Sequence, residues 1–297
     1  MVGENGEELA GVRENILKSR RFGFSSLIDA MFATDFILSE LGAIPQTNSD
    51  VYSYKEADTQ SLFTRVNQFI DSWLLNDQGG DYRDLAHRKQ VPALRKAFLR
   101  TDLSGTQIIG RNGAEYHCLT AGAKVSGRGG TKQNIHWSEV AFYGNTAILD
   151  ARNLVTGAEE QVSGGIGKIF RETTGNVADD FFSSEYHLAK EDKSDFKSRF
   201  LAWHLFGAYK TKAPSDWQPP EYYSKLLYDG VTKDQCYWHF KKTRELSDKR
   251  RMREYPSTDV EAFLLGGDPF FSPDALLFYT NMIQKPNKES LYVSSLS

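Results

Sequence analysis

The sequence of 297 residues is poor in cysteine and has no long apolar run. Its two cysteines, Cys118 and Cys236, are too few for a disulfide framework or a four-cysteine zinc site, and they suit a reducing cytosol. The best apolar stretch, residues 27–38, is interrupted by Asp29 and Asp35, whereas a membrane-spanning helix needs about 20 apolar residues. We therefore expect neither a disulfide-stapled secreted domain nor a membrane partner.

The first residues also lack the pattern of a secretory signal, because Glu4, Glu7 and Glu8 stand there without an apolar segment. Charge of one sign is not in excess: 36 basic and 39 acidic residues give a net charge of -3. That balance disfavours a protein coated in nucleic acid, although a local basic patch can still bind it. With 40% apolar residues, the chain has enough material for a full core.

Strand-like and helix-like segments alternate over the first two thirds of the chain. The β-type runs stand at residues 13–18, 51–54, 107–109, 116–119, 134–137 and 166–171, and helix-type stretches at 25–41, 62–73 and 83–98. This alternation predicts an α/β fold with a mainly parallel sheet flanked by helices on both faces. Beyond about residue 210 the chain becomes helical, aromatic and charged, which indicates a smaller second unit.

The turn after the first strand is basic and rich in hydroxyl groups. A parallel α/β sheet binds phosphate at such a turn, because backbone N–H groups and the helix dipole attract an anion. Gly23 and Ser25 fit the Walker A pattern G-x-x-x-x-G-K-[ST], but Lys18 replaces the first glycine and Phe24 replaces the lysine. Lys18 can supply the ammonium group from the front of the loop. The alternative is a solvated, basic start of a helix.

The run at residues 134–138 ends in a carboxylate, Glu139. In phosphate-loop ATPases the strand beside the first one ends in Asp-Glu (Walker B): the Asp holds the Mg²⁺ shell and the Glu polarises the attacking water. Here Ser138 replaces the Asp and Glu139 remains, which alone is weak evidence. We expect His136 on this strand to be a hydrogen-bonded core residue rather than a ligand.

Two polar turns leave two interpretations open. Residues 126–131 form either a surface turn or a loop in which Arg128 pairs with a phosphate. Residues 172–176, Glu-Thr-Thr-Gly-Asn, form either an ordinary turn or a group of hydroxyls and an amide that sense a γ-phosphate.

A basic helical region in the last third is interleaved with Trp238 and His239. It is either a DNA-phosphate patch or a solvated helix face balanced by Glu245 and Asp248. Its cations are Lys241, Lys242, Arg244, Lys249, Arg250, Arg251 and Arg253.

Taken in order, these segments resemble the ATPase motor of the large terminase subunit of tailed phages. The loop at residues 18–26 is similar to that family's K-x-R-x-x-G-[FYI]-S form, and residues 126–131 stand directly before the acidic strand. Residues 172–176 are similar to its coupling motif. The most specific likeness is residues 232–238 followed by 253–263, Arg-Glu-Tyr-Pro-Ser-Thr-Asp-Val-Glu-Ala-Phe, which is similar to the block that closes this ATPase region.

The resemblance covers about residues 13–272 and implies an additional-strand phosphate-loop ATPase fold. It implies an ATPase core over residues 1–210, a helical lid or linker subdomain over 211–272, and a C-terminal linker or tail over 273–297. Large terminase subunits carry a C-terminal nuclease, which would begin about where this sequence stops. We therefore expect a motor without nuclease activity, as an isolated domain, a split gene product or a truncated remnant.

The resemblance also implies an activity and its site. It implies a homo-oligomeric ring that hydrolyses ATP with Mg²⁺ and moves double-stranded viral DNA into procapsids in the host cytoplasm, together with a portal protein and a small terminase subunit. Glu139 would activate water, Ser25 (or Ser26) and Ser138 would support Mg²⁺, and Arg128 would contact phosphate. Coupling to movement would fall to Thr173, Thr174 and Asn176. The nucleotide would be bound by Lys18, Ser19, Arg20, Arg21, Phe22, Gly23, Phe24, Ser25 and Ser26.

Two other functions stay open. One is a helicase-like ATPase, which would need further nucleic-acid motifs in a second sheet domain that the helical last third does not offer. The other is a degenerate ATPase fold that binds DNA or portal without turnover. Phe24, Ser138 and the absence of a convincing adenine-contacting segment before the loop favour the second of these.

Overall fold

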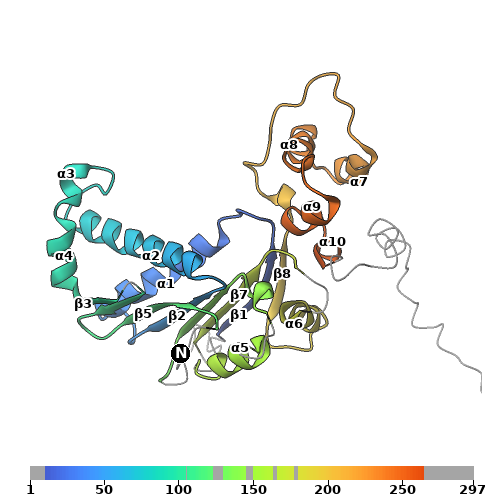
Figure 1. Ribbon diagram of the computed structural model, residues 1–297. Coiled ribbons are helices and arrows are strands. Elements are labelled where there is room, and N and C mark those ends of the chain that lie inside the picture. Colours follow the sequence, from blue (N-terminus) through green and yellow to red (C-terminus); the bar gives the residue numbers. More distant parts are fainter. Residues whose placement is uncertain are drawn as a thin grey trace, which may run out of the picture.

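The computed structural model describes residues 11–104, 106–122, 130–144, 150–162, 166–176 and 180–263, with the side chains of 101–104 left out. Its centre is an eight-stranded sheet (Figure 1). In sheet order the strands are β3 (Leu99–Ser104), β4 (Gln107–Gly110), β5 (Glu115–Thr120), β2 (Asn48–Ser53), β6 (Asn134–Ser138), β7 (Lys168–Thr173), β1 (Val12–Lys18) and β8 (Lys197–Leu201).

Pairing is parallel from β5 through β8, and antiparallel pairing adds only β4 and β3 at one edge. The expected mainly parallel α/β fold is therefore confirmed. One detail of the expectation is wrong: the acidic strand β6 does not lie beside β1, because β7 stands between them. Parallel strands all end at the same edge of a sheet, so the carboxyl ends of β1, β7 and β6 still lie side by side.

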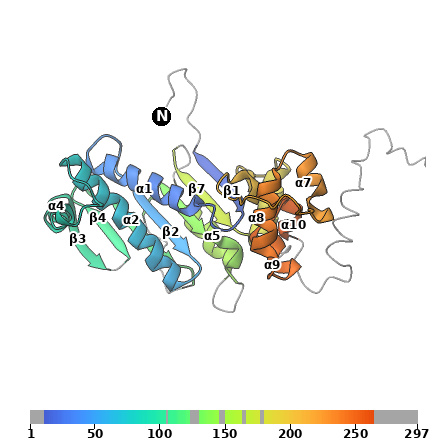
Figure 2. The ribbon, with the colours of Figure 1, turned by 90° about the horizontal axis from the view of Figure 1, so that it is seen from above.

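Helices cover both faces of the sheet (Figures 1 and 2). Because successive side chains of a strand point to opposite faces, Ile16 packs into the core on one side and Leu17 into the core on the other. The first core includes Phe32 and Val66, and the second includes Phe182. One face carries α1 (Phe24–Glu40) and α2 (Glu56–Asp77), and the other carries α5 (Ala151–Glu159) and α6 (Phe181–Lys190).

The helices at the far edge of the sheet are short. The expected helical stretch at residues 83–98 is divided into α3 (Leu85–Arg88) and α4 (Val91–Phe98), and α4 leads directly into β3 (Figure 1). Pro92 lies in the first turn of α4, where its missing N–H costs nothing. In the described ranges, no helix combines the length and the apolar content that crossing a bilayer requires.

A helical subdomain lies at the opposite end of the sheet, next to β8 (Figures 1 and 2). It has its own aromatic core, in which Trp203 stacks on His239 with ring centroids 4.3 Å apart. This core begins at Trp203, shortly before the expected boundary at residue 210. Its helices are α7 (Ser224–Tyr228), α8 (Lys233–Thr243), α9 (Asp248–Glu254) and α10 (Asp259–Phe263), with 3₁₀ turns η2 (Trp203–Leu205) and η3 (Glu221–Tyr223).

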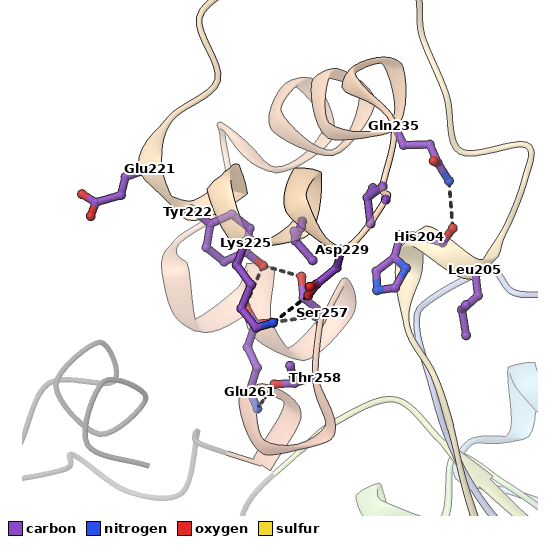
Figure 3. Close-up of a pocket in the computed structure, with 13 residues that line it drawn as sticks. His204, Leu205, Glu221, Tyr222, Lys225, Asp229, Gln235, Ser257, Thr258 and Glu261 are labelled. Atoms are coloured by element: carbon purple, nitrogen blue, oxygen red, sulfur yellow. Dashed lines mark hydrogen bonds and ion pairs between the residues drawn. The ribbon is translucent and has the colours of Figure 1, made fainter. Parts of the chain in front are cut away.

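A cavity of about 910 Å³ opens within this subdomain (Figure 3). Two of its polar side chains bond to protein groups: the Tyr222 hydroxyl donates to Glu261 at 2.9 Å, and the Gln235 amide donates to the carbonyl of His204 at 2.8 Å. The charged pair there, Lys225 with Asp229, is exposed. The residues singled out in the sequence lie elsewhere, at the end of β1.

Candidate functional site

Lys18 is the last residue of β1 and is 5% exposed. Its ammonium Nζ lies 3.0 Å from Glu139 Oε1 and 2.9 Å from Glu172 Oε2. The expected cation and the expected carboxylate therefore share one site at the carboxyl edge of the sheet. The second carboxylate, that of Glu172 in β7, is one that the sequence analysis did not single out.

The charges of this site stabilise one another. Burial lowers the pKa of Lys18, but the carboxylates of Glu172 and Glu139 outweigh burial and raise it above its usual value. Burial likewise raises the pKa of Glu172, while Lys18 and His136 outweigh that effect and hold it well below its usual range. Both groups are thus charged at neutral pH, and the site keeps an ammonium group ready to meet an anion.

The loop after Lys18 turns sharply into α1. Gly23 precedes the helix with φ of 78°, a left-handed conformation that glycine adopts without a steric penalty. The turn brings Ser25, in the first turn of the helix, to the carboxyl ends of the strands, where its Oγ donates to Glu172 Oε1 at 2.7 Å. A helix N-terminus, a hydroxyl and Lys18 therefore surround one point, as an anion site requires.

Other residues of the loop have different surroundings. The Arg20 guanidinium pairs with Glu254 of α9 at 2.7 Å, and Phe22 packs on Phe206 with centroids 5.2 Å apart, so both contact the helical subdomain. Phe24 packs against the core beneath α1. Ser19 is buried, and its Oγ has no hydrogen-bond partner among the described residues.

Two further loop residues complete the set. Arg21 is exposed and has a left-handed backbone, with φ of 57°. Ser26 is half-buried, and in the part of the chain that the structure describes its hydroxyl makes no hydrogen bond. Of the two serines, Ser25 is therefore the one whose hydroxyl faces the carboxylates.

Glu139 follows β6 in a left-handed conformation, with φ of 57° and ψ of 43°. A non-glycine residue held there is strained by about 1–3 kcal/mol, and such strain is concentrated at functional sites. Its Oε2 accepts hydrogen bonds from the Thr174 backbone N–H at 3.1 Å and from the hydroxyls of Thr173 and Thr174 at 3.3 Å each. The turn predicted to couple hydrolysis to movement therefore orients the predicted water-activating carboxylate.

Asn176 supports the same turn by donating from Nδ2 to the Ala141 carbonyl at 2.8 Å. A cavity of about 200 Å³ opens at the site, lined in part by Ser25, Ser138 and Glu139. The roles of these residues stay predictions. Arg128, the other expected phosphate contact, lies outside the described residues.

Behind the site, a chain of buried charges runs to α2. His136 Nε2 lies 3.3 Å from Glu172 Oε1, its Nδ1 lies 3.5 Å from Asp29, and Asp29 in turn accepts from Arg65 of α2 at 2.7 Å. Burial lowers the pKa of His136, but its two carboxylate partners outweigh burial and raise it to about 8. His136 is thus a hydrogen-bonded core residue, as expected, and one that fixes Glu172.

The helical subdomain holds the site from the other side. Besides the pair of Arg20 with Glu254, the Arg20 backbone N–H donates to the Glu254 carbonyl at 2.8 Å, and Tyr209 donates to the Arg20 carbonyl at 2.7 Å. Gly175 of the coupling turn lies so close to α10 that a Cβ there would overlap the carbonyl oxygen of Ala262. Both the loop and the coupling turn therefore touch the helical subdomain.

We expect Gly175→Ala to lower the free energy of unfolding by about 1–3 kcal/mol, because the added methyl group meets backbone that cannot rotate away. Gly144→Ala is the matched control, since a Cβ at position 144 would meet no atom within 4 Å. Denaturant unfolding of both variants checks this. Equal stability of the two variants would show that α10 does not press on the coupling turn.

The two aromatic residues of the basic region of α8 and α9 pack inward. Trp238 stacks on Tyr209 with centroids 4.0 Å apart, and His239 is buried and bonds to the Tyr223 hydroxyl at 2.8 Å. His239 is therefore buried in the subdomain, and the half-buried Trp238 packs against the subdomain's core. The contact of the neighbouring cations with DNA stays a prediction. Of the cations, Arg250 pairs with Glu254 at 3.0 Å.

No protein-family model matches this sequence, and no curated protein matches it. Among solved structures, the large terminase of bacteriophage HK97 superposes with a TM-score of 0.50 at 14% identity, covering 83% of this chain and 47% of that one. This chain has the fold of the matched part of that large terminase. The expected resemblance is therefore confirmed at the level of the fold, and the chain spans about half the length of the HK97 protein.

Two further terminases are similar at lower scores. The ATPase domain of the Thermus phage P74-26 large terminase has a TM-score of 0.46 at 13% identity, with 82% of this chain and 87% of that one covered. The large terminase of another thermophilic bacteriophage, in a complex with ADP, has a TM-score of 0.44 at 10% identity, with 83% and 48% covered.

Proposed function

We propose that this chain is the ATP-hydrolysing motor domain of a DNA-packaging terminase. The observation that carries the proposal is the meeting of Lys18, Ser25 and Glu139 at one edge of a sheet with the fold of a phage large terminase. A buried ammonium beside a helix N-terminus binds polyphosphate, and a carboxylate a few ångströms away can orient water. ATP is the substrate that this combination fits.

Lys18 acts first in the proposed mechanism. Its ammonium leaves Glu139 and turns to the β- and γ-phosphates, which carry more negative charge than one carboxylate. Glu139 Oε1 is then free to accept a proton from water, while Oε2 stays bonded to Thr174 and Thr173. Phosphate binding would thus prepare the carboxylate for in-line attack, with catalysis by positioning and charge.

Mg²⁺ would supply charge neutralisation on the β- and γ-phosphates. Ser25 and Ser138 line the cavity beside Glu139, and their hydroxyl oxygens are of the ligand type that suits a hard cation. Among the described residues no group of three or more His, Cys, Asp or Glu side chains could hold a metal ion.

Movement would pass through the coupling turn. When the γ-phosphate leaves, Lys18 returns to Glu139, and the change reaches Thr173 and Thr174 through the hydrogen bonds to Oε2. Gly175, the next residue, presses on α10 and so transmits the shift to the helical subdomain. The Arg20–Glu254 pair would let the phosphate loop act on α9 at the same time.

The proposed partners follow from the terminase resemblance. They are double-stranded viral DNA, a portal protein, a small terminase subunit and further copies of this chain in a ring, acting on procapsids in the host cytoplasm. The cations of α8 and α9 would meet DNA phosphates, which predicts binding that weakens with salt and has little sequence preference.

Nucleotide-dependent thermal stabilisation tests this function. A ligand at one hundred times its Kd stabilises the folded state by about 2.7 kcal/mol, so we expect ATP with Mg²⁺ to raise the melting temperature by about 5 °C or more. AMP, which lacks the β- and γ-phosphates, is the matched control and should give little shift. No shift at millimolar ATP would favour the degenerate module that binds DNA or portal without turnover.

A further inference from the structure

Glu172 is the point at which two hydroxyl groups of the site meet. Its side chain is fully buried, and the same oxygen, Oε1, accepts from Ser25 Oγ at 2.7 Å and from Ser138 Oγ at 2.9 Å. In a phosphate-loop ATPase, the hydroxyl at the position of Ser25 and an acidic residue at the position of Ser138 together hold the metal. Here both positions carry serine, and both serines point to one carboxylate.

The strand register explains how this arises. Ser138 and Glu172 are direct partners across the parallel pair of β6 and β7. A carboxylate at position 172 therefore lies at the same level of the sheet as one at 138 would, one strand closer to β1. Glutamate is one methylene longer than aspartate, which lets it reach toward the neighbouring strand.

We propose that Glu172 supplies the carboxylate of the Mg²⁺ site, in place of the acidic residue absent from position 138, with Ser25 and Ser138 beside it. This inference rests on the proposed ATPase function. Mg²⁺ takes oxygen ligands, keeps several waters, and is bound through one or two carboxylates plus substrate phosphates. One carboxylate with two hydroxyls is a donor set of that kind.

Glu139 and Glu172 have different surroundings, which suit them to different roles. The Glu139 side chain is 34% exposed and bonds to the coupling turn, so it can meet water. Glu172 is instead enclosed, and His136 holds it from behind while Asp29 holds His136. A ligating carboxylate that is itself fixed by hydrogen bonds is the usual arrangement in metal sites.

The test separates metal binding from phosphate binding. The Kd of a non-hydrolysable ATP analogue is measured with Mg²⁺ and with EDTA, and the ratio of the two values is the metal factor. Glu172→Gln should reduce this factor by about tenfold or more. Glu160→Gln, which changes an exposed carboxylate at the end of α5, is the matched control and should leave it within about threefold of the wild type. Mn²⁺ bound in the complex, counted by electron paramagnetic resonance, gives a second readout.

A second variant, which moves the carboxylate from β7 to β6, tests the proposal if Glu172→Gln does not fold. Ser138→Glu combined with Glu172→Ser moves the carboxylate back to β6, and its metal factor should return to within about threefold of the wild type. A metal factor unchanged in Glu172→Gln, or lost in the swapped protein, overturns the assignment of Glu172. Failure of the wild type to bind the analogue at all overturns the proposed ATPase function, and this inference with it.

Discussion

Glu139→Gln is expected to bind ATP about as well as the wild type and to hydrolyse it about 100-fold or more slowly. The amide has the shape of the carboxylate and can still accept from the Thr174 N–H, which lies 3.1 Å from Oε2. It cannot take a proton from water, however, and general-base assistance of this kind contributes about 10²- to 10⁴-fold. Loss of turnover with retained binding therefore distinguishes a base from a structural group.

Single-turnover hydrolysis and an ATP titration, performed on the same preparation, measure the two quantities. Glu160→Gln is the matched control, because it removes one exposed carboxylate at the end of α5. Turnover by Glu139→Gln equal to that of Glu160→Gln would remove Glu139 from the mechanism. A loss of ATP binding as large as the loss of turnover would instead assign Glu139 to holding the nucleotide.

The local pattern of the sequence was sufficient for the parallel strands at the centre of the fold. The apolar runs at 13–18 and 134–137 became β1 and β6, since each is short, β-rich and bounded by turn residues. The order of strands in the sheet was not accessible in the same way. It depends on pairings between segments far apart in the chain, and β7 enters between β1 and β6 only because residues 168–173 pair with both.

Several helices and strands were not predicted from the sequence, because their patterns of apolar residues are short or irregular. The helices α5 and α6 are short, although Asp150 and Asp180 cap their N-termini and were readable as start signals. The edge strand β8 is mostly half-buried or exposed and carries Lys197 and Arg199, so it lacks an apolar run. Charged residues on an edge strand prevent pairing with other chains, which is why such strands look unlike strands.

The block at residues 253–263 was the most specific part of the resemblance, but the sequence offered no physical reason for its spacing. The structure supplies one. Glu254 pairs with Arg20 of the phosphate loop, Ser257 accepts from the Trp203 indole at 2.9 Å, and Ala262 abuts the coupling turn. The block therefore joins the helical subdomain to the site at two points, Glu254 and Ala262, while Ser257 holds the block to the subdomain's own core.

The part played by Glu172 could not be read from the sequence, because its meaning depends on the pairing of β6 with β7. A clue was present: one strand end lacks an acidic residue at 138, and another carries an extra one at 172. The strand register sets Ser138 opposite Glu172, and it shows that the missing carboxylate at 138 and the extra one at 172 belong to the same place in the site. Asp29 was missed for the same reason, since it reaches the site through His136. Arg65 was missed because only the packing of α2 brings it to the cavity beside Glu139.

Lys18→Met should destabilise the protein by about 3–5 kcal/mol and abolish ATP binding. The ammonium is buried between two carboxylates, and removing one partner of a buried ion pair leaves an uncompensated charge. Chemical denaturation measures the first effect. The second cannot be interpreted in this variant alone, because a partly unfolded protein also fails to bind.

The double variant Lys18→Met/Glu172→Gln separates the two effects. It neutralises the buried carboxylate together with the ammonium, so we expect most of the lost stability to return while ATP binding stays absent in both Mg²⁺ and EDTA. Double-mutant coupling of neighbouring residues is commonly about 0.5–3 kcal/mol, and a buried pair belongs at the upper end. Recovery of ATP binding with stability would mean that Lys18 serves only to neutralise Glu172. If the double variant is stable but does not bind ATP, the Lys18 ammonium is needed to bind the phosphates. That is the role expected of a cation at the front of the loop.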